Sequence, residues 1–440
     1  MDEQNLYLSN FSQFEKEIGD QDQLFLKELR QSAIDRFAEL GFPTLSDEEW
    51  RFTNLAPLLE VPFQLATLGR HGLTKARLRE ITLHADAGCC LVFVNGFFAA
   101  ELSTLCPSLA GVTICSLAEA LEQQPEVIEE HLARYANYEE HPFIALNTAF
   151  IRDGAFIHVA KGQVIREPIH LLFVNTSTEP SVSQPRNLIV LDVNSQATVL
   201  ESYVGLNEDV YFNNIVTEVA LSENAVLDHY KAEQESPRAF HLATLQIHQQ
   251  RGSNFSSHYF GLGGRLTRHE ANTRLDGEGC ECTLNGLYMA NGTQHLDNRT
   301  LIDHAMPHCA SHELYKGILD GKAHGVFNGK IFVRPDAQKT DAKQTNQTLL
   351  LSDDAIINTK PQLEIYADDV KCTHGATVGQ LSADGLFYLR SRGIGLEDTR
   401  RLLIYAFAND IVNRVRIEPI RRQLEELLLR RQQLGGREAL

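Results

Sequence analysis

The stretch Asn194-Ser-Gln-Ala-Thr-Val199 occurs again, with changes, as Ser222-Glu-Asn-Ala-Val-Leu227 and as Ser352-Asp-Asp-Ala-Ile-Ile357. Each copy places a polar turn before an alanine, and β-branched or aliphatic residues follow. A recurring turn with a small inward residue is typical of a β-solenoid, in which every rung stacks on the previous one and buries a continuous core. The copies are irregularly spaced, so a β-sandwich remains the alternative on this pattern alone.

The sequence around these turns is rich in short strand-like runs. No long helical period interrupts them between Phe156 and His374. The runs are Ile169–Val174, Leu188–Val193, Thr198–Val204, Ile215–Leu221, Leu245–His248 and Ile331–Val333. Short apolar and β-branched runs bounded by turn residues predict strands. We therefore expect a β-core over residues 156–376.

Helical patterns flank this core on both sides. Apolar residues recur at helical spacing up to Leu40, and Gly41 stands where a helix commonly ends. Ser46 and Glu49 match a capping box, which predicts a second helix start. The sequence thus predicts an N-terminal helical domain at 1–88 and a small α/β segment at 89–155 that leads into the core.

The C-terminal segment, residues 377–440, is predicted to form a third, helical domain. Ser382 can cap a helix that runs to Arg392, and Gly393 can end it. Pro419 is well placed in the first turn of a later helix. The expected architecture is mainly β with helical flanks.

The composition of the chain argues against some classes of function. The 440 residues carry 40 basic and 58 acidic side chains, and the net charge of −18 argues against non-specific nucleic-acid binding. The acidic start lacks the features of a signal or transit peptide, and no run approaches the roughly 18 apolar residues of a membrane span. The eight cysteines suit buried thiols in a reducing compartment, so a cytoplasmic location is expected.

Nucleotide-binding motifs are missing from the sequence. The stretch Gly317-Ile-Leu-Asp-Gly-Lys322 lacks the spacing and the following Ser or Thr of a phosphate-binding loop, and Gly261-Leu-Gly-Gly264 follows no βα pattern. We therefore expect that this chain binds no nucleotide and that any nucleotide hydrolysis comes from a partner.

Three groups of residues could bind metal or a metal cluster. The first, His304, His308, Cys309 and His312, is dense in zinc-type ligands, but Pro307 interrupts the helix that would align His304 with His308. The second, Cys280 and Cys282, shares one strand face and has no second pair at finger-like spacing. For both groups a structural role is the favoured interpretation.

The third group is Cys372-Thr-His374, which closes the β-region just before the helical cap. On an extended strand, residues two apart share a face and lie roughly 6.5–7 Å apart. Both side chains could therefore face a cluster-sized object more easily than a single metal ion. A buried cysteine with a hydrogen-bonded histidine is the structural alternative.

These residues and their surroundings resemble the SufB/SufD family. The resemblance runs through His324–Ile331, Gln338–Gln347, Leu349–Ser352, Lys360–Gly379 and Leu386–Gly393. Glu49-Trp-Arg-Phe-Thr53 is similar to the N-terminal motif of the family, so the resemblance covers most of the chain. The form Cys-Thr-His-Gly-Ala-Thr resembles the SufD branch.

The resemblance implies a right-handed parallel β-helix with helical N- and C-terminal domains. It implies a non-enzymatic iron–sulfur cluster assembly subunit that pairs with a SufB-like subunit and binds a SufC-like ATPase in a SufBC₂D scaffold; a homodimer is a further option. His374 then corresponds to a transient iron–sulfur cluster ligand shared with SufB, and Cys372 to the neighbouring interface cysteine. The helices after the core are expected to dock SufC through Leu386, Phe387, Arg390, Arg392, Leu402 and Phe407.

Three other functions remain as alternatives. The chain could be a purely architectural subunit that contributes no cluster ligand. A β-helix carbohydrate-active enzyme needs paired carboxylates, but Asp353/Asp354 and Asp368/Asp369 are adjacent residues that point to opposite strand faces. A zinc hydrolase would have to use the histidines of 304–312. The sequence disfavours both enzymes.

Overall fold

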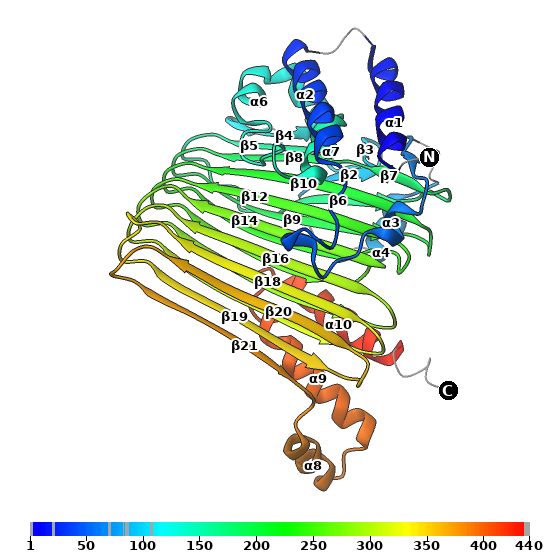
Figure 1. The fold of residues 1–440 in the computed structure, drawn as a ribbon, viewed down its shortest axis with the longest axis vertical. Coiled ribbons are helices and arrows are strands. Elements are labelled where there is room, and N and C mark those ends of the chain that lie inside the picture. The colour runs from blue at the N-terminus through cyan, green and yellow to red at the C-terminus, as the bar shows by residue number, and fades with distance from the viewer. Residues whose placement is uncertain are drawn as a thin grey trace.

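The computed structural model describes residues 3–19, 23–68, 72–81, 83, 88–105 and 109–434. Its centre is a parallel β-solenoid of two facing sheets, and successive strands of the coil alternate between them (Figure 1). Side chains one turn of the coil apart, such as Asn194 and Asn224, are 30 residues apart in the sequence. The predicted solenoid is confirmed, and the β-sandwich alternative is wrong.

Sheet A consists, in spatial order, of β20 (Ile356–Ile365), β18 (His324–Val333), β16 (His295–His304), β14 (Leu266–Leu275), β12 (Phe240–Gln249), β10 (Tyr211–Leu221), β8 (Arg186–Leu191), β5 (Ala155–Val159) and β4 (Val112–Ser116). The short strands β1 (Gln64–Leu65) and β7 (Ser181–Ser183) join it beside β10. Sheet B consists of β21 (Lys371–Gly379), β19 (Asp341–Leu350), β17 (Ala310–Leu319), β15 (Glu281–Ala290), β13 (Asn254–Gly261), β11 (Val226–Gln234), β9 (Gln196–Gly205), β6 (Ile169–Asn175), β2 (Cys89–Val94) and β3 (Phe97–Phe98).

The recurring turns have the role that the sequence predicts. Ala197, Ala225 and Ala355 are buried in or against the apolar interior between the sheets. Asn194 and Asn224 adopt left-handed φ angles of 59° and 57°, a conformation that asparagine tolerates better than most residues. Asn224 Nδ2 donates to Asn194 Oδ1 at 3.0 Å, so neighbouring turns are also joined through their side chains.

The N-terminal helices cover the outer face of sheet A near its first strands (Figure 1). An aromatic cluster that includes Phe37, Trp50, Phe143 and Phe212 joins them to that sheet. The helical elements are α1 (Glu3–Ile18), α2 (Leu24–Leu40), η2 (Glu48–Trp50), α3 (Ala56–Leu59), α4 (Lys75–Ile81), α5 (Leu117–Gln123), α6 (Pro125–His131) and α7 (Pro142–Ala149). The segment 89–155 also supplies β2, β3 and β4, which extend both sheets at this end.

The predicted helix end at Gly41 is confirmed, since its N–H donates to the Phe37 carbonyl. The predicted capping box at Ser46 is wrong. The chain forms only the short 3₁₀ helix η2, where Asp47 accepts from the Thr44 N–H and Ser46 caps nothing.

The C-terminal helices α8 (Ala383–Ser391), α9 (Leu396–Val412) and α10 (Glu418–Leu434) follow the last strand. Ser382 caps α8 by accepting from the Gly385 N–H, and Gly393 follows the helix at φ 88°, as predicted. Apolar side chains of α9 and α10 pack on outward-facing residues of sheet B, such as Tyr230 and Ile318. Within the described residues, no helix is both long and apolar enough to cross a membrane.

Candidate functional site

The two ends of the solenoid differ. At the first end, the sheets finish in the antiparallel strands β3 and β4, and α5 packs against β4. At the other end, β20 and β21 each have a strand neighbour on one side only within the described chain (Figure 1). Their exposed apolar side chains include Ile356, Ile365 and Val378, which are 56%, 39% and 45% exposed. This open end presents two parallel edges with free backbone hydrogen-bonding groups.

Cys372 and His374 lie on β21 with their side chains on the interior side of sheet B. In β19, Ala342 and Gln344 are buried between the sheets, and the register pairs Ala342 with Cys372 and Gln344 with His374. Paired residues of a parallel ladder point to the same side of the sheet. The i, i+2 spacing therefore places both side chains on one face, at the mouth of the open end.

The surroundings of these two side chains differ. Cys372 is half-buried and packs against the apolar cluster of Ala342 and Ala367, and burial raises the pKa of its thiol. His374 is exposed and has no side-chain hydrogen bond to any described residue. The imidazole is therefore accessible to a ligand or partner, whereas burial disfavours the thiolate form of Cys372.

A buried polar row lies behind His374. Gln344 Nε2 donates to Glu313 Oε2 at 2.8 Å, and Glu313 pairs in register with Gln344 just as Gln344 pairs with His374. Burial raises the pKa of Glu313 to about 7, although hydrogen bonds with Thr300 and Gln344 oppose the shift. Gln344 Oε1 is buried and has no hydrogen-bond donor.

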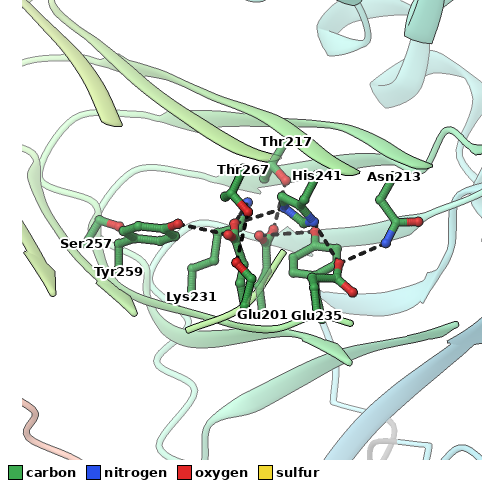
Figure 2. Close-up of polar contacts among 12 residues, drawn as sticks. Glu201, Asn213, Thr217, Lys231, Glu235, His241, Ser257, Tyr259 and Thr267 are labelled. Carbon is green, nitrogen blue, oxygen red and sulfur yellow. Dashed lines mark hydrogen bonds and ion pairs between the residues drawn. The ribbon is translucent and has the colours of Figure 1, made fainter. Parts of the chain in front are cut away.

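A second polar cluster fills the solenoid interior near the middle of the coil (Figure 2). His241 contacts Glu233 at 2.9 Å and Glu235 at 2.8 Å, and Lys231 lies 3.4 Å from Glu233. Burial by itself would raise the pKa of Glu233, but the charges of His241 and Lys231 lower it overall. Burial would lower the pKa of His241, but Glu233 raises it. These groups therefore form buried ion pairs.

Tyrosine and asparagine side chains complete this cluster. Tyr259 donates to Glu233 at 2.8 Å, Asn213 donates to Glu235 at 2.9 Å, and Tyr211 also donates to Glu235. The cluster lies on β10, β11, β12 and β13, with Glu235 directly after β11, several rungs from the open end. Its charges are paired inside the coil, and the contact between His241 of β12 and Glu233 of β11 joins sheet A to sheet B.

The histidine-rich segment 304–312 does not form one site. His304 is buried and shares a hydrogen bond of 2.9 Å with Ser311, whereas His308 occupies a turn at φ 60° and His312 is exposed. Cys309 is buried. In the described ranges, no group of three or more His, Cys, Asp or Glu side chains could hold a metal ion.

The remaining cysteines among the described residues are mostly buried, as predicted, and Cys106 lies outside the described residues. Cys280 and Cys282 lie in the solenoid interior, and Cys280 forms a hydrogen bond with Cys309 on the neighbouring turn. Burial raises the pKa of Cys282 to about 12. Cys89 departs from the expectation of free thiols, since it is disulfide-bonded.

The residues predicted to dock an ATPase fall into two groups. On α8, Phe387 is 76% exposed and Arg390 is exposed with it, and Arg392 is exposed directly after the helix. Leu402 of α9 is also exposed, and Leu386 is half-buried. Phe407 instead faces the solenoid, where Lys316 Nζ lies 4.6 Å from its ring centre.

Sequence reasoning missed Glu313, Gln344 and the interior ion pairs. Gln344 stands inside Gln338–Gln347, a stretch that the family resemblance already singled out. Its position behind His374 depends on the register between β19 and β21, which no local sequence signal fixes.

Comparisons with known proteins agree with this fold. The SufBD protein N-terminal region matches residues 1–171, and the SufBD core domain of SUF system FeS cluster assembly matches residues 173–407. An iron-sulfur cluster assembly SufBD family protein of Synechocystis is 37% identical over 417 residues, which cover 93% of this chain and 91% of the relative. The iron-sulfur cluster assembly protein SufD of Escherichia coli is 32% identical over 90% of each chain. SufD of Bacillus subtilis is 26% identical over 97% of each.

Two matched domains that together span most of the solenoid, and relatives above 30% identity along nearly the whole length, establish the family. The chain belongs to the SufBD family of the SUF iron–sulfur cluster assembly system.

Proposed function

We propose that this chain is a scaffold subunit that pairs through its open solenoid end with a SufB-type subunit, and that His374 contributes a ligand to an iron–sulfur cluster built at the seam. One observation carries the proposal: His374 lies accessible on the interior face of the last strand, at the end of the coil where no described strand pairs with β20 or β21 from outside. A side chain in this position would contact a partner subunit that docks on that end of the solenoid.

The open end is suited to strand-to-strand pairing. Free N–H and C=O groups along β20 and β21 can hydrogen-bond to the edge of a second solenoid, which is the mode called β-augmentation. The exposed Ile356, Ile365 and Val378 would be buried in the same contact. A second copy of this chain offers the same edges, so a homodimer is the alternative pairing.

The chemistry of the seam suits a cluster that is cargo and must later leave. Clusters are usually held by thiolates, and imidazole can replace some of them. Cys372 must lose a proton before it binds iron, and burial raises the pKa of its thiol. His374 is also the more exposed of the two side chains, so it is the stronger candidate.

The exposed surface of α8 supports docking of a SufC-type ATPase. Phe387 and Tyr388 are 76% and 57% exposed, and Leu402 on α9 is 48% exposed. Large exposed apolar side chains that gather on one element mark interaction surfaces. Phe407 would act indirectly, because it anchors α9 to Lys316.

The ligand role is tested by His374→Ala against Thr373→Ala, its neighbour on the outward face of β21. In cells that depend on SUF alone, we expect His374→Ala to abolish cluster maturation while co-purification of the SufB-type and SufC-type partners persists. Thr373→Ala should mature clusters normally. Full maturation by the His374→Ala variant would leave the chain a purely architectural subunit and would refute the ligand role.

The docking surface is tested separately by Phe387→Ser combined with Leu402→Ser. This double variant should lose the ATPase in a pull-down, whereas Leu429→Ser, which alters an equally exposed leucine of α10, should retain it. Retention by the double variant would contradict docking on α8.

A further inference from the structure

The buried amide of Gln344 has a hydrogen bond at its NH₂ group and none at its carbonyl oxygen. Its Nε2 donates to Glu313 Oε2 at 2.8 Å, and its Oε1 is buried without a donor. A buried acceptor left without a partner destabilises the fold, and most buried polar atoms in proteins have a hydrogen-bond partner, so this atom calls for an explanation. The residue that stacks on Gln344 in the next rung is His374, about 4.8 Å away in the hydrogen-bonding direction of the sheet.

The orientation of this amide is fixed by its surroundings. A carboxyl oxygen of Glu313 accepts, so the NH₂ group of Gln344 turns toward Glu313 and the carbonyl oxygen is left for another donor. Gly329 of β18 lies against the same amide, because a Cβ at this glycine would collide with Gln344 Nε2. The side chain is therefore confined between two sheets and cannot easily turn over.

Building on the proposed function, we propose that Gln344 is a positioning residue for His374: its Oε1 accepts from the ring nitrogen that faces the interior, and this hydrogen bond leaves the lone pair of the other nitrogen directed at the seam. Histidine ligands of metals commonly donate their second ring N–H to such an acceptor, which fixes the tautomer. Glu313 acts one rung further back by holding the amide in the required orientation.

The test is the tautomer of His374 in the full-length chain labelled with ¹⁵N-histidine, measured at a pH well above the pKa of about 7 of Glu313, so that its carboxylate can only accept. Long-range ¹H–¹⁵N spectra identify the His374 signals as those absent from His374→Ala. We expect a single dominant tautomer in the wild type and a mixture of both in Gln344→Met, which keeps the side-chain volume. Thr348→Val alters another interior residue of β19, in register with Val378, and should leave the tautomer unchanged.

A second variant keeps the test decisive if Gln344→Met fails to fold. Glu313→Gln can accept or donate, so the amide of Gln344 loses its fixed orientation and the single tautomer should weaken. An unchanged tautomer in the folded variants overturns the positioning role by itself. The proposed function fails by a different result, namely normal cluster maturation by His374→Ala, so the two failures are distinguishable.

Discussion

Lys316 of β17 forms an ion pair of 2.8 Å with Asp410 of α9, and this pair joins the C-terminal helices to the solenoid. The lysine side chain is only 7% exposed, and its Nζ also donates to the Phe407 carbonyl at 3.3 Å. The aspartate is about half exposed, and its hydrogen bond with Lys316 lowers its pKa. One buried cation therefore joins the base of the proposed ATPase-docking helices to the solenoid.

Replacing Lys316 by methionine should loosen α9 without unfolding the coil. We expect a local loss of about 1–2 kcal/mol, because Asp410 can be rehydrated while the contacts with Phe407 are lost. Hydrogen exchange of residues 396–412 should accelerate roughly 5- to 30-fold. Arg430→Met removes an exposed pair with Glu426 and should change nothing measurable. Equal protection in Lys316→Met and wild type would show that the pair does not anchor the helix.

The buried ion pair Arg186–Glu218 should contribute much more to the free energy of unfolding than the pair Lys316–Asp410 does. Both side chains are fully buried, and Glu218 also accepts from the backbone N–H groups of Ala133, Tyr135 and Ala136. Glu218→Gln leaves the guanidinium without a counter-charge, which should cost about 3–5 kcal/mol of the free energy of unfolding. Urea denaturation measures this loss.

The matched control for that variant is Glu223→Gln, which breaks a partly exposed pair with Arg251. Its expected cost is below about 1 kcal/mol. Similar losses in the two variants would mean that the buried pair has no special role in joining the loop at 133–136 to the solenoid.

Glu313 should make stability depend on pH near neutrality. Burial raises its pKa from an ordinary value of 4.5 to about 7, so the folded state binds the proton more tightly than the unfolded state does. Between these two pH values the free energy of unfolding should fall as the pH rises, by as much as about 3 kcal/mol in total. Glu313→Gln has no carboxyl to titrate, so its stability should lack this component.

Denaturation of both proteins between pH 4.5 and pH 8 gives the comparison. The stability of Glu313→Gln relative to wild type should increase with pH through this window. A constant difference would contradict a raised pKa at Glu313.

Local signals predicted the parts of the fold that local physics controls. Ser382 and Gly393 mark the two ends of α8 because a hydroxyl cap and a left-handed glycine act on their own helix. The alanine turns at Ala197 and Ala225 predicted the stacked coil for a similar reason, since only a small inward residue fits there.

Tertiary contacts determine the features that local sequence signals did not predict. The capping signal at Ser46 is overridden where Glu49 contacts Arg299 and Trp50 stacks on Arg268 at 3.6 Å. In the second half of β11, the charged side chains face the interior and an aromatic side chain faces outward, the reverse of the usual alternation. Lys231 and Glu233 point into the coil, while Tyr230 points outward beneath the C-terminal helices. In the sequence, charged residues at alternate positions of a strand indicate a solvent-facing side. In this strand they face the interior, where charges from neighbouring strands pair with them, and this pairing depends on how the strands stack.

Ligation by His374 is tested most directly by ¹⁵N hyperfine spectroscopy of a cluster-loaded complex. The cluster is assembled anaerobically on this chain, labelled with ¹⁵N-histidine, together with an unlabelled SufB-type partner, and is then reduced to a paramagnetic state. We predict the strong coupling of one directly bound ¹⁵N nucleus in the wild type and in Thr373→Ala, and its loss in His374→Ala. A wild-type complex that carries a full cluster without any ¹⁵N coupling would contradict the claim that His374 binds the cluster.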